Sequence, residues 1–256
     1  LTPDMLAEHR HWLAPEALDP VTGKLILCIQ SYLVRTPHHT ILVDTCVGND
    51  KTLPAHPFWH QQKSDHYMRQ LAAAGVGVED IDYVMCTHLH VDHVGWNTRL
   101  ENGRWVPTFP RAKYLFAEKE LAYWTAKYAE AAFPIFAESV LPIVAAGRNQ
   151  AITSSSALND HVRLEPTPGH TPDHYAVQLG RGATSAVLTG DLIHSPIQLR
   201  LPEISMRADT DPVQSAQTRR RFLECYCDTQ TLVCTAHFPS PSSERVTRWG
   251  DGFKMK

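Results

Sequence analysis

Neither sign of charge dominates this chain. Its 256 residues include 24 lysines and arginines against 27 aspartates and glutamates, which gives a formal net charge of -3 at pH 7. Proteins that hold nucleic acid or an acidic membrane surface generally carry a marked excess of positive charge. We therefore expect neither nucleic acid nor a membrane as partner.

Long apolar runs, repeats and low-complexity segments are missing as well. No stretch approaches the roughly 20 apolar residues that a transmembrane helix needs, and no secretory leader is visible after Leu1. The composition, 43% hydrophobic and 20% charged, is that of an ordinary globular protein. We expect a single domain over residues 1–256, located in the cytoplasm.

The six cysteines lack the spacing of a zinc ribbon. Three of them lie in apolar, strand-like runs, and the close pair Cys225 and Cys227 has no matching pair after it. We expect free thiols in a reduced compartment.

The chain does have a cluster of metal-ligand side chains in residues 87–95, THLHVDHVG. Imidazoles and carboxylates are the groups that zinc and similar ions bind, and four of them fall within six positions: His88, His90, Asp92 and His93. The apolar run 81–86 before them predicts a buried strand, so the cluster lies on the loop that leaves a strand end. Leu89 alternates with His88 and His90, which can therefore face one way. One loop thus presents two pairs of ligands to two neighbouring metal positions.

Two similar halves, each with strands followed by helices, are predicted along the chain. Apolar or alternating runs bounded by turn residues predict strands, and Asn102-Gly103 predicts a hairpin. The expected strands are 23–34, 40–44, 81–86, 112–116, 162–165, 175–179, 185–188 and 231–234. The expected helices are 64–74, 117–132, 136–146 and 211–227. Two such halves predict an α+β fold, a four-layer αββα sandwich with the sheets inside.

Three further ligand candidates, His170, Asp191 and His237, stand where later strands end. We expect them to collect at one edge of the sheets, beside the loop of residues 88–93. Each of the two metals then has its own ligands, with one carboxylate between them: His88, His90 and His170 for the first, Asp92, His93 and His237 for the second, and Asp191 between the two. Both metals keep room for a shared water, which catalytic sites need.

Taken in order, THLHVDHVG, PGHT, GD and the late AH resemble the motifs of the metallo-β-lactamase superfamily of metallohydrolases. Asp44, at the end of an early strand, is similar to that superfamily's first motif and is expected to hold a ligand in place from behind. The resemblance spans residues 44 to 237. It implies the αββα fold, the ligand sets given above and two zinc ions as cofactors, with other divalent metals also suited.

The resemblance further implies a hydrolase in which a hydroxide bridging the two metals attacks an ester. Two cations lower the pKa of the shared water, and one of them polarises the oxygen under attack. Asp92 is the candidate proton carrier. True β-lactamases of this fold lack the bridging aspartate that Asp191 provides, whereas the seven-ligand set resembles acyl-homoserine lactonases and methyl parathion hydrolase. We expect a small-molecule ester as substrate, with a lactone favoured.

Two alternatives stay open. One is an aryl ester or phosphotriester hydrolase of the methyl parathion hydrolase type, because His194 stands where acyl-homoserine lactonases commonly carry a tyrosine. The other is a non-hydrolytic di-iron redox or sensor module. No flavodoxin-like domain or glycine-rich phosphate loop in this chain supports that second alternative.

Some side chains near the expected metals have two interpretations. His194 either contacts the substrate or holds Asp191 in place, and His174 is expected to support its loop. Three aromatic residues either wall an apolar substrate pocket or pack in the core: Trp96, Phe58 and Trp59. The apolar segment Phe133–Ile143 is either a pocket lid or the surface of a homodimer.

Overall fold

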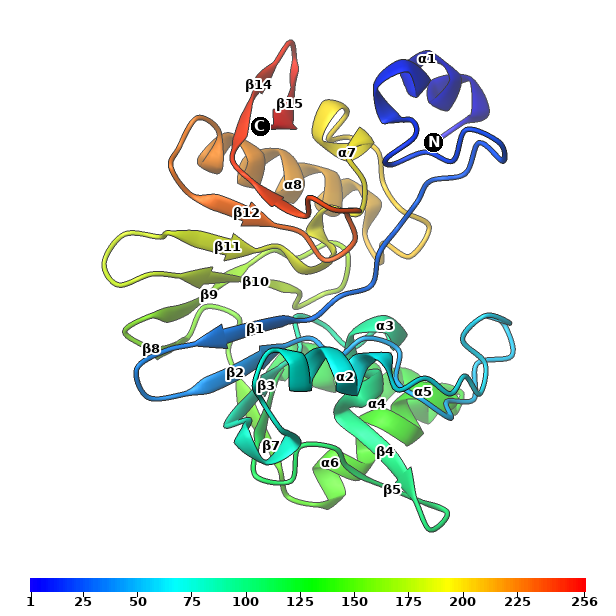
Figure 1. Cartoon of the computed structure of the whole chain (residues 1–256), viewed down its shortest axis with the longest axis vertical. Coiled ribbons are helices and arrows are strands. Elements are labelled where there is room, and N and C mark those ends of the chain that lie inside the picture. The colour runs from blue at the N-terminus through cyan, green and yellow to red at the C-terminus, as the bar shows by residue number, and fades with distance from the viewer. The chain divides into compact units, whose positions relative to one another are not determined.

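The computed structural model describes all 256 residues, and the chain divides into two compact units. Residues 30–153 form one unit, which we call the internal unit, and residues 1–29 and 154–256 form the terminal unit. The chain therefore begins and ends in the terminal unit, which carries the first blue segment and the light-green to red elements of Figure 1. No helix has the length and apolar character needed to cross a membrane. A single functional domain over residues 1–256 stays a prediction.

A five-stranded sheet organises the internal unit. Its order is β1-β2-β3-β6-β7, with β1 antiparallel to β2 and the other neighbours parallel. The strands are β1 (Tyr32–Arg35), β2 (Thr40–Val43), β3 (Tyr83–Met85), β6 (Lys113–Ala117) and β7 (Asn149–Ile152). The central strands are apolar on both faces, as buried parallel strands require, and Val84 and Met85 are fully buried.

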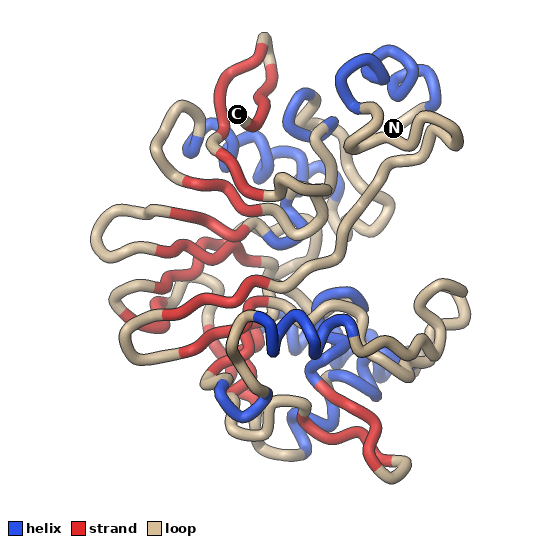
Figure 2. The backbone as a smooth tube through the Cα atoms, viewed as in Figure 1, coloured by secondary structure: helices blue, strands red, loops and turns tan.

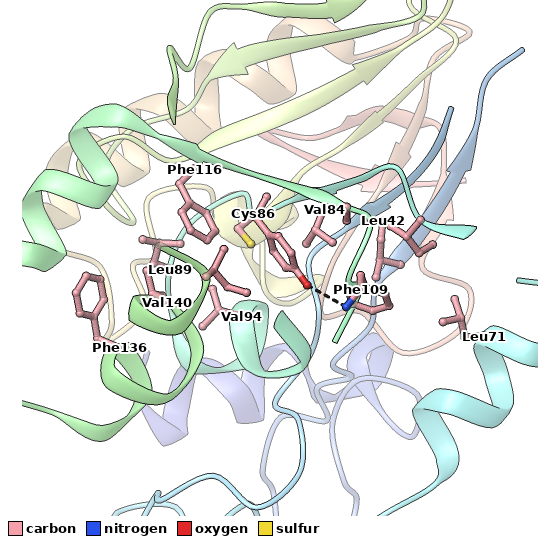
Figure 3. Packing of buried hydrophobic residues seen from close by; sticks show 14 of the residues in the cluster. Leu42, Leu71, Val84, Cys86, Leu89, Val94, Phe109, Phe116, Phe136 and Val140 are labelled. Carbon is pink, nitrogen blue, oxygen red and sulfur yellow. Dashed lines mark hydrogen bonds between the residues drawn. The ribbon is translucent and has the colours of Figure 1, made fainter. Parts of the chain in front are cut away.

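Helices and a hairpin complete the internal unit (Figure 2). They are α2 (His66–Ala73), η1 (Val78–Asp80), α3 (Val91–Val94), η2 (Gly95–Asn97), α4 (Glu118–Glu130), α5 (Pro134–Ser139), α6 (Leu141–Ala145) and the hairpin of β4 (Thr98–Glu101) and β5 (Arg104–Pro107). One apolar core joins sheet and helices, and Figure 3 shows Val84 and Phe116 of the sheet with Leu89 and Val94 of the following loop and helix. Leu89 is thus anchored in the core, which holds residues 87–93, called the histidine loop below, against the sheet.

A six-stranded sheet in the order β13-β12-β11-β10-β9-β8 organises the terminal unit. Only the β11–β12 pair is parallel. The strands are β8 (Ala157–Asn159), β9 (Val162–Pro166), β10 (Tyr175–Leu179), β11 (Ala186–Leu188), β12 (Leu232–Cys234) and β13 (Ser243–Glu244), and a separate hairpin joins β14 (Val246–Trp249) to β15 (Gly252–Met255).

Helix α8 (Pro212–Tyr226) is the main helix of the terminal unit. It begins after Asp211, whose side chain accepts a hydrogen bond from the backbone N–H of Gln214 at 2.9 Å. Phe222 and Leu223 pack in one apolar cluster with residues of the sheet. The shorter helices are α1 (Pro3–Leu13), η3 (Gly190–Leu192) and α7 (Ile197–Arg200).

The long strand expected over residues 23–34 is wrong, because only β1 forms. Strand β2 offers four residues and pairs with four. The preceding backbone bonds elsewhere: Ile26 donates its N–H to the carbonyl of Ala17 at 3.0 Å, and Cys28 donates to that of His237 at 2.9 Å.

The single helix expected over residues 136–146 is also wrong, because α5 and α6 are separate. Pro142 has no N–H to donate to the carbonyl of Glu138 one turn earlier. That carbonyl instead accepts hydrogen bonds from the Thr98 hydroxyl and from the Lys51 amine. The proline therefore frees an acceptor that binds a buried cation.

Candidate metal centre

The histidine loop of the internal unit leaves β3 and enters α3. Leu89 is buried in the core, as expected, and the rings of His88 and His90 meet edge to face with centroids 4.6 Å apart. The ring of His93 lies 4.1 Å from that of His88. The loop therefore gathers three imidazoles at one place, beside the partly exposed carboxylate of Asp92.

Asp44 orients two of these imidazoles. Its Oδ2 lies 2.9 Å from Nδ1 of His93, and its carboxylate accepts hydrogen bonds from the backbone N–H and the hydroxyl of Thr87. The Thr87 hydroxyl gives its proton to Asp44, so it accepts from Nδ1 of His88, which lies 3.1 Å away. Both rings thus carry their proton on Nδ1 and present Nε2 as the ligand atom.

A buried glutamate supports the same loop from α4. Glu120 is 1% exposed, and its Oε1 accepts from the backbone N–H of Leu89 at 3.2 Å and from the indole N–H of Trp124 at 2.7 Å. The Trp124 ring meets that of His90 edge to face, 5.4 Å between centroids. Trp124 is therefore the tryptophan in ring contact with a predicted ligand.

In the terminal unit, three imidazoles converge on the carboxylate of Asp191. Nε2 of His237 lies 2.8 Å from Oδ1, and Nε2 of His194 and of His170 lie 3.0 Å and 3.2 Å from Oδ2. All four side chains are nearly or fully buried. They come from segments that follow β9, β11 and β12, and the structure brings the predicted residues His170, Asp191 and His237 together there.

In His170 and His237, the hydrogen bond on the side away from Asp191 indicates which ring nitrogen carries the proton. Nδ1 of His170 lies 2.7 Å from a carboxylate oxygen of Asp209, and Nδ1 of His237 lies 2.7 Å from the carbonyl oxygen of Cys28. Both partners are acceptors, so each Nδ1 carries the proton and each neutral ring turns the lone pair of Nε2 toward Asp191. Two lone pairs facing a buried carboxylate need a proton or a cation between them. The residues present therefore fit a bound divalent cation.

Without a cation, His170 can take up a second proton on Nε2, between its ring and Asp191. Burial lowers the pKa of its imidazole, but the hydrogen bonds to Asp191 and Asp209 outweigh burial and raise the pKa to about 9. Two carboxylates therefore draw positive charge to this ring.

His194 differs from its two neighbours. Its Nδ1 is buried and has no hydrogen-bond partner, so a neutral ring can donate Nε2–H to Asp191 without any cation. Burial lowers the pKa of His194, which favours this neutral form. Its ring stacks on that of His237, 5.2 Å between centroids.

His174 supports the aspartate from behind. Its Nε2 accepts the backbone N–H of Asp191 at 3.0 Å, and its Nδ1 lies 2.7 Å from the hydroxyl of Thr167. Both nitrogens are engaged in the protein, which leaves neither for a metal.

The predicted pocket aromatics of the internal unit lie in different surroundings. Trp96 is buried and stacks on Tyr67. Trp59 is half-buried and stacks on His56, whereas Phe58 is 93% exposed. Their role in a substrate pocket stays a prediction.

Sequence reasoning missed three supporting side chains: Thr87, Glu120 and Asp209. Thr87 adjoins the histidine cluster and could have been included as a hydroxyl next to a ligand. Asp209 lies on an irregular segment 39 residues after its partner, and no spacing pattern marks it. All six cysteines are free thiols, and Cys225 is exposed.

The chain matches the family model of the metallo-beta-lactamase superfamily over residues 29–237, and it belongs to that superfamily. It is also similar to an N-acyl homoserine lactonase from Bacillus sp, with 28% identity over 177 residues. That similarity covers 65% of this chain and 64% of the lactonase, so the chain spans slightly less than two thirds of the relative's length.

Solved structures of similar fold include a dizinc quorum-quenching lactonase, AidC, in complex with a product. The TM-score is 0.74 at 23% identity, over 90% of this chain and 79% of the other. Another is the hydrolase AbOPH of the beta-lactamase superfamily, with a TM-score of 0.79 at 22% identity, over 100% of this chain and 89% of the other. The predicted α+β class, the metallo-β-lactamase fold, is thereby confirmed.

Proposed function

We propose that this chain is a metal-dependent hydrolase that uses two zinc ions to open an ester, with a lactone as the favoured substrate. The observation that carries the proposal is the carboxylate of Asp191, which the ligand-ready Nε2 atoms of His170 and His237 face. We assign four ligands from the internal unit and three from the terminal unit: His88, His90, Asp92 and His93, with His170, Asp191 and His237. Histidine and carboxylate donors in this ratio suit zinc.

The chemistry divides between metal and protein. When bound, the two cations would polarise the ester carbonyl and bring the pKa of a water close to neutrality. Asp92 lies in the first turn of α3 and is partly exposed, and we assign to its carboxylate the transfer of a proton to the leaving oxygen. Asp44, Asp209 and the Cys28 carbonyl orient the imidazoles, and Glu120 holds the backbone of the histidine loop. The ligands therefore keep their arrangement during turnover.

Two observations favour a lactone with an acyl chain. The Gly190-Asp191 motif resembles the one that supplies the bridging aspartate, which true β-lactamases of this fold lack, and the curated relative is an N-acyl homoserine lactonase. The indole of Trp124 beside His90 offers an apolar surface for such a chain, with Trp96, Phe58 and Trp59 as further candidates. We place the protein in the cytoplasm, where six free thiols persist, and the homodimer surface at residues 133–143 stays part of this proposal.

The alternative substrate class is an aryl ester or phosphotriester. His194 favours it, because an imidazole stands where acyl-homoserine lactonases commonly have a tyrosine. The same metals and the same Asp92 would serve either reaction.

The test is proton release by the zinc-loaded full chain, with an acyl-homoserine lactone, a simple aliphatic lactone and an aryl phosphotriester in parallel. We expect fast lactone opening that a chelator abolishes and that His88→Gln removes. The matched control is His38→Gln, an exposed turn histidine of the same unit. Turnover of the phosphotriester alone would move the assignment to the alternative, and a coloured, iron-rich protein without hydrolysis would support the redox or sensor module.

A further inference from the structure

A fully buried arginine lies in the terminal unit, on the helix α8. Arg219 is 0% exposed, and its guanidinium donates hydrogen bonds to three backbone carbonyls, those of Leu192, Pro202 and Ile204, each at 2.7 Å. A fourth hydrogen bond goes to the hydroxyl of Ser215 at 2.9 Å. Burying a cation is costly unless its donors are satisfied, so a residue this completely bonded has a defined place in the structure.

The same guanidinium faces the acid that orients His170. Nη2 of Arg219 lies 3.8 Å from Oδ2 of Asp209, and Oδ1 of Asp209 lies 2.7 Å from Nδ1 of His170. The backbone N–H of Met206 also donates to Oδ2, at 3.0 Å. Burial alone would raise the pKa of Asp209, but its bonds with His170 and the nearby Arg219 lower it, so the acid is ionised. The guanidinium, with its pKa lowered by burial to about 10, is still a cation at neutral pH.

Arg219 also contacts the segment that carries Asp191. The carbonyl of Leu192, which it binds through Nε, belongs to the residue directly after Asp191. One planar group therefore contacts the segment that carries Asp191 and the acid that sets His170. Lysine could not do the same, because it has one nitrogen where arginine has a fork of three.

We propose that Arg219 is a positioning residue for the metal half-site of the terminal unit, by which we mean His170, Asp191 and His237. Through Asp209 it fixes His170 with Nε2 toward Asp191, and through the Leu192 carbonyl it fixes the segment that bears Asp191. This inference rests on the proposed function only in assigning a metal to that half-site.

The test measures zinc affinity by competition with a chromophoric chelator, in full-length protein carrying Arg219→Met, Arg219→Lys or Asp209→Asn. We expect Asp209→Asn to lower the affinity for one of the two zinc ions by about 10- to 100-fold. This is the usual range when a carboxylate that bonds to a metal-bound histidine is removed. Arg219→Met should lower the affinity for the same ion. Arg219→Lys should lose less affinity than Arg219→Met, because it keeps the charge. The matched control is Arg221→Met, an exposed arginine two residues along the same helix, which should bind zinc as wild type does.

A second readout separates positioning from general stability. In zinc-loaded protein the Nδ1 proton of His170 should exchange slowly with solvent, and the Arg219→Met and Asp209→Asn variants should speed its exchange. Arg219→Met protein that is less stable to heat but binds both zinc ions with wild-type affinity would overturn the inference, as would unchanged exchange of that proton. Asp209→Asn decides the matter if Arg219→Met does not fold.

Lactone turnover in the same preparations distinguishes this inference from the proposed function. Wild-type protein that binds zinc but opens no lactone, with the variants weakened as expected, would refute only the proposed function. Active wild-type protein whose variants bind zinc normally would refute only the role of Arg219.

Discussion

The two units supply metal ligands in opposite ways. In the internal unit, four candidate ligands lie within six residues of one loop, and a single carboxylate, Asp44, orients two of their rings. In the terminal unit, the ligands come from three separated segments, and each ring has its own partner: Asp209 for His170 and the Cys28 carbonyl for His237. Support is therefore shared in the internal unit and distributed in the terminal unit.

Each unit also contains a buried basic side chain, and the two differ in how far burial lowers their pKa. Lys51 of the internal unit and Arg219 of the terminal unit are both 0% exposed. Lys51 donates to the hydroxyl of Thr98 at 2.7 Å and lies 3.6 Å above the ring of Trp105. Burial lowers its pKa to about 7, whereas that of Arg219 falls only to about 10. Of these two residues, only Lys51 can therefore lose its charge near neutral pH.

The largest effect should come from Asp191→Ala, which removes the carboxylate that His170, His194 and His237 face. Three imidazoles lose a common partner and both proposed metals lose a ligand, so we expect turnover to fall by roughly a thousandfold or more, several kcal/mol of barrier. Metal content by elemental analysis and lactone turnover measure it. Asp160→Ala, at an exposed aspartate of the same unit, is the control. Full metal content with wild-type turnover would contradict the assignment of Asp191.

Asp44→Asn tests the shared support of the internal unit. An amide cannot accept hydrogen bonds through both of its terminal atoms, so it loses the orientation of His93 or of Thr87 and His88. We expect about a 10- to 100-fold loss of metal affinity.

Asp50→Asn is the matched control for that variant. Both aspartates have positive φ, +58° at Asp44 and +61° at Asp50, and asparagine tolerates this conformation. Equal zinc affinity of the two variants would show that Asp44 does not orient ligands.

The pH dependence of stability should differ between the units. Because burial sets the folded-state pKa of Lys51 at about 7, below its ordinary 10.5, the unfolded chain binds more protons between these values. Stability should therefore rise with pH across that window, by at most about 1.4 kcal/mol per pH unit. Glu138 and Asp50 oppose the shift but do not cancel it.

Lys51→Met should remove that rise, whereas Arg219 should contribute none below pH 10. Urea unfolding at pH 6.5, 8 and 9.5 measures the difference, with amide hydrogen exchange as the readout. Exchange in β4 and β5 reports on the internal unit, and exchange in α8 reports on the terminal unit. A rise that persists unchanged in Lys51→Met would assign it to other groups.

The smallest effect should follow Phe58→Ala. The side chain is 93% exposed, so we expect the free energy of unfolding to change by less than about 0.5 kcal/mol. Val213→Ala, at an exposed valine of the terminal unit, should be equally neutral. A raised KM for long-chain lactones in Phe58→Ala alone would place Phe58 in the substrate pocket, and an unchanged KM would exclude it.

Local patterns were enough to predict what lies close in sequence. The run of residues 87–95 gave the ligand loop, and the strand ends at β9, β11 and β12 gave His170, Asp191 and His237. The errors arose where long-range contacts decide, as at residues 23–34, whose backbone bonds to Ala17 and His237 in place of a strand partner. Asp209 lies on a segment without a periodic signal, and only the folded chain brings it to His170. The predicted helix over 117–132 included Glu120 but did not show that its carboxylate would bond to the backbone of Leu89.

The contact between His237 and the carbonyl of Cys28 closes a loop of 209 residues. During synthesis, the internal unit has emerged completely once residue 153 leaves the ribosome. The terminal unit must wait until residue 237 and its neighbours follow, because its sheet includes β12 and β13. Nascent chains released before that point would carry the complete histidine loop but lack the His237 contacts of Cys28 and the last two strands of the terminal sheet, which makes truncated chains targets for chaperones and proteases.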